Sequence, residues 1–210
     1  MSNNKIAILF ENTDFQVVNK PAGVLTIPGR DPDAADSVVE TLTTPNQKMW
    51  VVHRLDKETS GCLIFAKNEN AHRQASQWFE KHEAKKEYWA FAAGEPRVPV
   101  QKFDQPIEGA RSITQMNVVG RFPGGFLASI RIPTGKRHQI RIHLSAGGYP
   151  LFGDPEYNGK KSLDLDGHVI EFNRVALHAR RLELPGGLKF EAPFPEDFVS
   201  WATQLGVVLK

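Results

Sequence analysis

The chain has 210 residues, of which 40% are hydrophobic and 24% are charged, and this balance excludes a disordered chain. The formal net charge of +2 excludes a strongly basic protein, so the total charge argues only weakly for an anionic partner. No run approaches the roughly 20 apolar residues of a membrane span, and the run at residues 6–10 is too short for a signal peptide. Cys62 is the single cysteine, which excludes an internal disulfide and suits a reducing compartment. We therefore expect a cytoplasmic protein without membrane contact.

Along the first half of the chain, short apolar runs alternate with loops and two helical patterns. In chain order, these patterns predict a hairpin over residues 6–10 and 15–19, a proline- and glycine-rich loop over 19–33, a short helix capped by Asp36, a buried strand over 62–66, and a helix over 70–82. The last of these places Ala71, Ala75, Trp78 and Phe79 on one face, as expected for a helix that packs on a core.

The second half of the chain is dominated by hairpin patterns. It predicts a strand over 87–93, a hairpin over 113–120 and 125–132, a helix over 134–148 capped by Thr134, a surface excursion over 158–173, a hairpin over 175–192, and a final helix that starts near Pro195. Because strands outnumber helices, we expect an α+β fold with a largely antiparallel mixed sheet flanked by helices and loops. The absence of repeats and linkers predicts one domain over residues 1–210.

The spacing of histidines and cysteines disfavours metal binding and nucleophilic catalysis. His138 and His143 are five residues apart, roughly 140° around a helix, so they do not converge on one ion. The chain has no cysteine pair and no Gly-x-Ser-x-Gly elbow, and Cys62 opens an apolar run like a small buried residue. Glycine loops of the phosphate-binding kind are also absent. We expect no metal and no cofactor.

Basic residues gather in stretches that contain no acid. One stretch, residues 131–143, carries four of them: Arg131, Lys136, Arg137 and Arg141. On a helix, Arg137 and Arg141 would share a face. Arg180 and Arg181 form a further pair. Each cluster alone is typical of a solvated surface, but several of them beside glycine-containing loops favour a polyanion such as RNA.

One acid stands in an unusual setting, the segment "HRLDKETSG" at residues 53–61. It places Asp56 two residues after Arg54 and close to Gly61. Asp56 could belong to a polar turn, or it could be a reacting carboxylate on a shaped loop. Arg141 is its candidate partner, because a neighbouring guanidinium favours the ionised carboxylate and fixes its orientation. Composition alone leaves both interpretations open.

Six blocks, taken together and in order, resemble the RluA-type pseudouridine synthases, which isomerise selected uridines in ribosomal or transfer RNA. The blocks are "VVNKPAGV", "HRLDKETSG", "KKEYWA", "TGKRHQIRIHL", "GYPLFGDPEY" and "LHARRLEL". The resemblance extends along almost the whole chain. It implies the pseudouridine synthase fold, a structured RNA substrate, no cofactor, no protein partner and a monomer. Some relatives carry a small N-terminal RNA-binding domain, which we do not expect here because the first block begins within twenty residues of Met1.

The resemblance also implies site residues. Asp56 would match the catalytic aspartate, and Arg141 the arginine paired with it. Tyr88 would match the tyrosine that packs on the target uracil, and Arg54 the arginine that helps occupy the space left by the flipped nucleotide. The remaining positions expected to bind the substrate are His53, Lys136, Arg137 and Leu177. The family usually has arginine where this chain has Lys136, with Arg137 next to it.

The chemistry of the reaction suits these residue types. Uridine and pseudouridine are isomers, so the conversion needs no redox cofactor, energy source or net water. A carboxylate at the sugar can attack C1′ or take the proton from C2′, and an aromatic ring can receive the flipped base. Two other functions stay open: an RNA-binding module without catalysis, which would not need Asp56, and a nucleoside hydrolase, which would need carboxylates that activate water and would leave the basic positions without a purpose.

Overall fold

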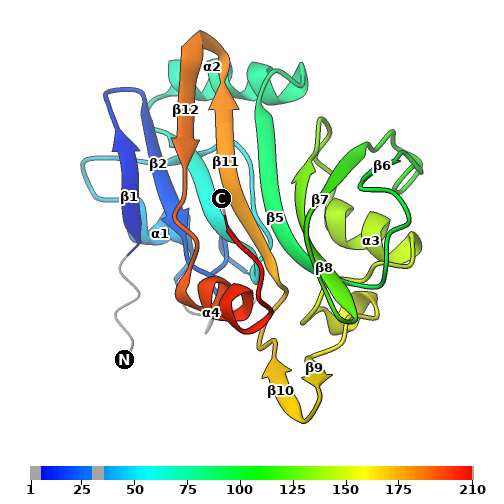
Figure 1. The fold of residues 1–210 in the computed structure, drawn as a ribbon. Helices are drawn as coiled ribbons and strands as arrows, with labels where there is room; N and C mark the ends of the chain where they lie inside the picture. The colour runs from blue at the N-terminus through cyan, green and yellow to red at the C-terminus, as the bar shows by residue number, and fades with distance from the viewer. Residues whose placement is uncertain (1–5, 30–35, 210) are drawn as a thin grey trace. The chain divides into compact units, whose positions relative to one another are not determined.

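The structure, a computed structural model, describes residues 6–29 and 36–209. The chain divides into two compact units, shown as a ribbon in Figure 1. The first unit comprises Met1–Lys86 and Ala179–Pro193, and the second comprises Glu87–His178 and Phe194–Lys210. The end of the predicted loop, residues 30–33, lies outside the described residues. Two strands, β5 (Lys85–Ala93) and β11 (Leu177–Leu184), contribute residues to both units.

The strands of the first unit are the short apolar runs of the sequence. Their order is β1-β2-β4-β11, β12 pairs with β11, and β3 pairs with β4 (Figure 1). The bounds are Ala7–Glu11 for β1, Phe15–Lys20 for β2, Trp50–Val51 for β3, Ser60–Ala66 for β4 and Leu188–Glu191 for β12. The β1–β2 and β11–β12 pairs are antiparallel, which confirms the two predicted hairpins.

Two helices belong to the first unit, and one of them begins differently from the prediction. Helix α2 (Glu69–Glu80) buries Ala71 and Ala75 as predicted and begins at the N-cap Asn68. For α1 (Val38–Leu42), the prediction that Asp36 is the N-cap is wrong: the cap is Ser37, which forms a capping box with Glu40. Ser37 is favoured because Glu40 stands three residues after it, so that each side chain can bond the other's backbone amide.

The second unit contains the antiparallel strands β5, β8, β7 and β6 in that order (Figure 1). Their bounds are Val100–Phe103 for β6, Thr114–Phe122 for β7 and Gly125–Arg131 for β8, and the β7–β8 hairpin was predicted. The predicted surface excursion contains a hairpin of its own, formed by β9 (Ser162–Leu165) and β10 (His168–Glu171). It forms a separate two-stranded sheet.

The helices of the second unit are α3 (Gln139–Ala146) and α4 (Glu196–Gln204). The prediction that α3 begins at a Thr134 cap is wrong, because its N-cap is His138 in the left-handed conformation (φ 53°). The hydroxyl of Thr134 instead accepts a hydrogen bond from the Ile113 amide at 2.9 Å. Helix α4 follows Pro195 as predicted and buries Phe198, Trp201 and Ala202.

Each unit has an apolar core. In the first, β2, β4 and α2 contribute Val17, Ile64 and Ala75 among others, and in the second α4 packs its Phe198 and Trp201 against Phe91 of β5. The largely antiparallel mixed sheet with flanking helices confirms the predicted α+β class. Among the residues described here, no helix is long and apolar enough to cross a membrane.

Candidate active site

Asp56 lies in a loop between β3 and β4 of the first unit. Its side chain is half-buried, and its backbone carbonyl accepts a hydrogen bond from the Thr59 amide at 3.1 Å. The loop ends where β4 begins, at Ser60 and Gly61. A Cβ at Gly61 (φ 118°) would lie 2.1 Å from the carbonyl oxygen of Ala179, so only glycine fits. The glycine that ends "HRLDKETSG" therefore lets β4 start beside β11 directly after the Asp56 loop.

His53 and Arg54, which precede Asp56, have different environments. The His53 ring stacks on Phe79 with centroids 4.6 Å apart, and its Nε2 accepts a hydrogen bond from the Ile64 amide. Burial, together with the nearby charge of Lys86, lowers the pKa of His53 to about 3. The imidazole is therefore neutral, as an accepting Nε2 requires. Arg54 is exposed, so its guanidinium is available to a ligand.

Tyr88 lies on β5 in the second unit. It is paired with Ile130 of β8 and is 7% exposed. Its neighbours in the strand, Trp89 and Phe91, belong to the apolar core around α4; Tyr88 is buried as well but is not a member of that core. Successive side chains of a strand point to opposite faces, which places Tyr88 away from that core, as its sequence position predicts.

Arg141, which is itself buried, is the centre of a polar cluster in the second unit. Its guanidinium donates to both carboxylate oxygens of Asp154, at 2.7 Å each, and to Glu156 at 2.9 Å. It also lies over the Tyr157 ring, 4.8 Å from the centroid. Burial opposes the charge of Arg141, but the hydrogen bonds and charges of Asp154 and Glu156 outweigh it and raise the pKa of the guanidinium. Arg141 is thus held as a fixed cation.

The cluster around Arg141 includes residues that the sequence patterns did not single out. Asp154 is fully buried, and Glu156 also lies 3.4 Å from Nδ1 of His138, which is hydrogen-bonded to the Tyr157 hydroxyl at 2.9 Å. Burial works against the charge of Glu156, but Arg141 holds the pKa of this carboxyl below its usual value. Asp154, Glu156 and Tyr157 all lie in the block "GYPLFGDPEY". Membership of this block is the sequence feature from which they could have been proposed as site residues.

The loop before α3 carries the basic pair Lys136 and Arg137. Both side chains are exposed, and neither has an ion pair among the residues that the structure describes. The buried side chain of Gln139 holds the loop, because its carbonyl accepts from the Thr134 hydroxyl and the Lys136 amide. The prediction that Arg137 and Arg141 share a helix face is wrong: the left-handed His138 starts the helix after Arg137.

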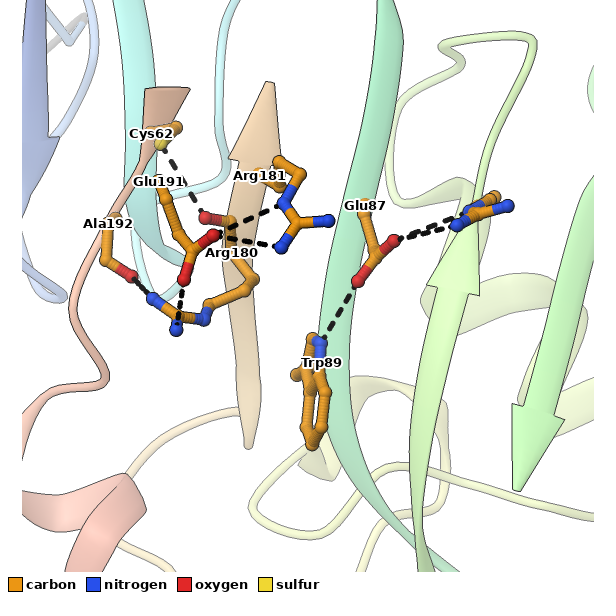
Figure 2. A network of polar contacts seen from close by, with 8 residues as sticks. Cys62, Glu87, Trp89, Arg180, Arg181, Glu191 and Ala192 are labelled. Carbon is orange, nitrogen blue, oxygen red and sulfur yellow. Dashed lines mark hydrogen bonds and ion pairs between the residues drawn. The ribbon is translucent and has the colours of Figure 1, made fainter. Parts of the chain in front are cut away.

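Arg131, Arg180 and Arg181 are paired with acids that lie outside their own stretches of sequence. Figure 2 shows Arg180 and Arg181 of β11 paired with Glu191 of β12. The Nη2 of Arg181 lies 2.9 Å from Oε2 of Glu191. In the second unit, Glu87 accepts a hydrogen bond from Arg131. It also accepts one from the Trp89 indole at 3.3 Å (Figure 2). The interpretation of Arg131, Arg180 and Arg181 as members of acid-free clusters is therefore wrong, because in the folded chain each of these arginines forms an ion pair with a glutamate.

Cys62 and Leu177 are both buried. The thiol donates to the Arg180 carbonyl at 3.7 Å (Figure 2), and burial raises the pKa of Cys62 to about 12, so it is a neutral core residue as predicted. Leu177 begins β11 with a buried side chain, and its carbonyl accepts from Arg174. Among the residues described here, no cluster of histidine, cysteine and carboxylate side chains could hold a metal ion.

The predicted site residues are thus divided between the units by chain position. Asp56, Arg54 and His53 belong to the first unit, and Tyr88, Arg141, Lys136, Arg137 and Leu177 to the second. The assignment of these residues to catalysis and substrate binding stays a prediction, and so does the pairing of Asp56 with Arg141.

Comparison with known proteins decides the family. Residues 14–146 match the family model for RNA pseudouridylate synthase. The chain is 31% identical to ribosomal large subunit pseudouridine synthase D of Pseudomonas aeruginosa, over 96% of this chain and 72% of that protein. It is 30% identical to the dual-specificity RNA pseudouridine synthase RluA of Haemophilus influenzae, over 84% of this chain and 85% of that protein. The chain belongs to the RluA-type RNA pseudouridine synthases.

The fold agrees with this assignment. The human protein RNA pseudouridylate synthase domain containing 4 superposes with a TM-score of 0.79 at 24% identity, covering 97% of this chain and 94% of that one. As a pseudouridine synthase, the enzyme is an isomerase that converts uridine to pseudouridine in RNA. The resemblance drawn from the six sequence blocks is confirmed.

Proposed function

We propose that this pseudouridine synthase modifies a specific uridine in structured ribosomal or transfer RNA, with Asp56 as the catalytic carboxylate. The observation that carries the proposal is the position of Asp56, half-buried in the loop before β4, a strand whose second residue, Gly61, must be glycine. A ribosomal target is favoured because a relative of 31% identity is named for the large ribosomal subunit. The exposed Lys136 and Arg137 supply charge for phosphate contacts.

The proposed reaction breaks the N1–C1′ bond of uridine and forms a C5–C1′ bond. The C5 proton is lost and N1 gains a proton, so the atoms balance without a co-reactant. The Asp56 carboxylate starts the reaction by attacking C1′ or by taking the C2′ proton, and both routes require it at the sugar. Arg141 would pair with Asp56 and fix its orientation, and its bonds to Asp154 and Glu156 would hold the guanidinium in place.

Access to the uridine requires base flipping, because C1′ of a stacked nucleotide is not reachable. The exposed Arg54 would then occupy the space that the base leaves, and the Tyr88 ring would receive the uracil. Leu177 would line the same pocket. His53 would contribute through its fixed, neutral ring, which holds the start of the loop against β4.

Mapping of pseudouridine in total RNA tests the substrate. A strain that lacks the enzyme should lose the modification at one or a few uridines of ribosomal or transfer RNA, and the wild-type gene should restore them. The purified enzyme should convert the same uridines in a transcript without releasing free uracil. Released uracil would identify a hydrolase, and binding without conversion would identify an RNA-binding module.

Replacement of Tyr88 tests how the base is held. Tyr88→Phe keeps the aromatic face, so RNA affinity should be retained, while turnover should fall if the hydroxyl helps remove the C5 proton. Tyr88→Ala should also weaken RNA binding, by about 1–3 kcal/mol for a lost stacking contact. Turnover and affinity should be measured beside thermal melts.

The core neighbour Trp89 provides the control for Tyr88. Trp89→Phe should lower the melting temperature and leave turnover per folded molecule unchanged, since Trp89 packs in the core of the second unit. If both Tyr88 variants behave like Trp89→Phe, with lower stability and full turnover, Tyr88 is a core residue and its assignment to the site is wrong.

A further inference from the structure

Asp56 lies in a loop whose backbone is held on both sides by one other segment, residues 20–26. Before Asp56, the Leu55 amide donates to the Thr26 hydroxyl oxygen at 3.1 Å, and the Thr26 hydroxyl donates to the Leu55 carbonyl at 2.9 Å. After Asp56, the Lys57 carbonyl accepts from the Lys20 ammonium at 3.0 Å and from the Gly23 amide at 2.9 Å. Segment 20–26 therefore holds the backbone of both residues next to Asp56, through the amide and carbonyl of Leu55 and through the carbonyl of Lys57.

The two side chains that make these contacts are buried. Lys20 is 0% exposed and Thr26 is 3% exposed. The Lys20 ammonium also donates to the carbonyls of Pro21 and Val24, at 2.8 Å each, so it closes its own segment into a tight loop. Water cannot readily replace such contacts, because a buried polar group that loses its partner also loses its solvation.

Segment 20–26 is itself attached to the start of α1. The Val38 amide donates to the Leu25 carbonyl at 2.8 Å, and the Val39 amide donates to the Thr26 carbonyl at 3.2 Å. These are N-terminal amides of the helix, which have no partner within it. Val38 is fully buried and anchors the helix. Contacts therefore run without a gap from α1 through Thr26 to the residue before Asp56.

We propose that Thr26 and Lys20 are positioning residues that hold the Asp56 loop in its reactive geometry. This inference rests on the proposed role of Asp56. Neither residue needs to touch the RNA, since each acts through the backbone of a residue next to Asp56, Thr26 through Leu55 and Lys20 through Lys57. Catalysis is sensitive to such support, because a misplacement of about 1 Å can cost about 100-fold in rate.

The matched pair Thr26→Val and Thr26→Ser tests the inference. Valine conserves the shape of threonine and removes both hydrogen bonds to Leu55, while serine keeps the hydroxyl. Thr26→Val should lower the single-turnover rate constant by about 10- to 100-fold, in line with a displaced reacting group, with an unchanged dissociation constant for RNA. Thr26→Ser should restore most of the rate. Hydrogen exchange should be faster at the Leu55 amide in Thr26→Val and unchanged at the amides of β4.

Two further variants separate positioning from stability and from the proposed function. Leu182→Ala destabilises the core of the first unit and should lower the melting temperature without changing the single-turnover rate of the folded enzyme. If Thr26→Val does not fold, Thr26→Cys replaces it, because a thiol is of similar size but is only a weak hydrogen-bond donor. The same loss of single-turnover rate with unchanged RNA affinity is expected. Asp56→Asn, assayed in parallel, shows whether Asp56 itself is required.

The outcomes are distinct. A fully active Thr26→Val enzyme beside an inactive Asp56→Asn enzyme would overturn only the positioning role, as would a Thr26→Ser enzyme as slow as Thr26→Val. If Leu182→Ala loses as much single-turnover rate as Thr26→Val, the effect of Thr26 on the rate comes from the stability of the first unit, and the positioning role is overturned. An active Asp56→Asn enzyme would overturn the proposed function and the positioning role with it.

Discussion

Asp56→Asn is expected to abolish pseudouridine formation, with a loss of at least about 10³-fold in turnover, the scale seen when a catalytic group is removed. The amide has the shape of the carboxylate but can neither attack C1′ nor take the C2′ proton. The fold should be preserved, because the backbone contacts of the loop, including the Asp56 carbonyl to the Thr59 amide, do not involve the side chain. RNA affinity should also be preserved. Tritium release from RNA labelled at C5 of uridine measures the turnover.

Glu58 offers a matched control for Asp56. It is a half-buried carboxylate in the same loop, two residues further along the chain. Glu58→Gln removes the same charge from nearly the same place and should leave turnover within a few-fold of the parent. Turnover of Asp56→Asn within tenfold of the parent would contradict the mechanism, and equal losses in both variants would indicate a general effect of loop charge.

Arg141→Met is expected to reduce turnover strongly and to destabilise the protein. The substitution leaves the fully buried Asp154 without its bidentate partner, and breaking a buried pair in this way costs about 3–5 kcal/mol. Arg141→Lys keeps the charge but cannot form the two parallel hydrogen bonds. It should therefore retain more stability than Arg141→Met and still lose turnover. Urea unfolding and tritium release measure the two effects separately.

Glu156→Gln is the control for Arg141, because it alters only the exposed partner of the guanidinium. The Glu156 side chain is 54% exposed, and an ion pair of this kind contributes about 1 kcal/mol or less. The lowered pKa of Glu156 means that this contribution is present above the usual pKa of the group and is lost as pH falls through the lowered value. Arg141→Met with the parent's turnover and unfolding midpoint would show that Arg141 has neither role.

Local patterns in the sequence predicted the elements well. The hairpins, α2 and α4 follow from the spacing of apolar residues and from turn residues, which act over a few positions. The burial of Cys62 follows from the continuous apolar run that it opens, since all of β4 is buried, and the facing of Tyr88 away from Trp89 follows from the alternation of strands. The family itself was recognisable from six short blocks in order, because catalytic loops need particular residues at particular places.

Helix starts were less predictable, because a cap is chosen by three-dimensional fit. Asp36 and Ser37 are both good N-cap residues. Ser37 is the cap because the Glu40 side chain can accept a hydrogen bond from its backbone amide. Thr134 has the right chemistry for a cap, yet its hydroxyl is used by the Ile113 amide and the Gln139 side chain, so α3 begins at Gln139. In both cases several residues offer the same hydrogen bond, and only the folded chain shows which one is made.

The sequence by itself determined the fold class and the family and proposed Asp56 as the catalytic carboxylate, because all three depend on local spacing and on residue types in order. Only the tertiary structure decided the partners of the charges. Arg131 bonds a glutamate 44 residues away, and Lys20 bonds a carbonyl 37 residues away. No periodicity reports such contacts, since they form when chain reversals bring distant segments together and when buried charges must find partners.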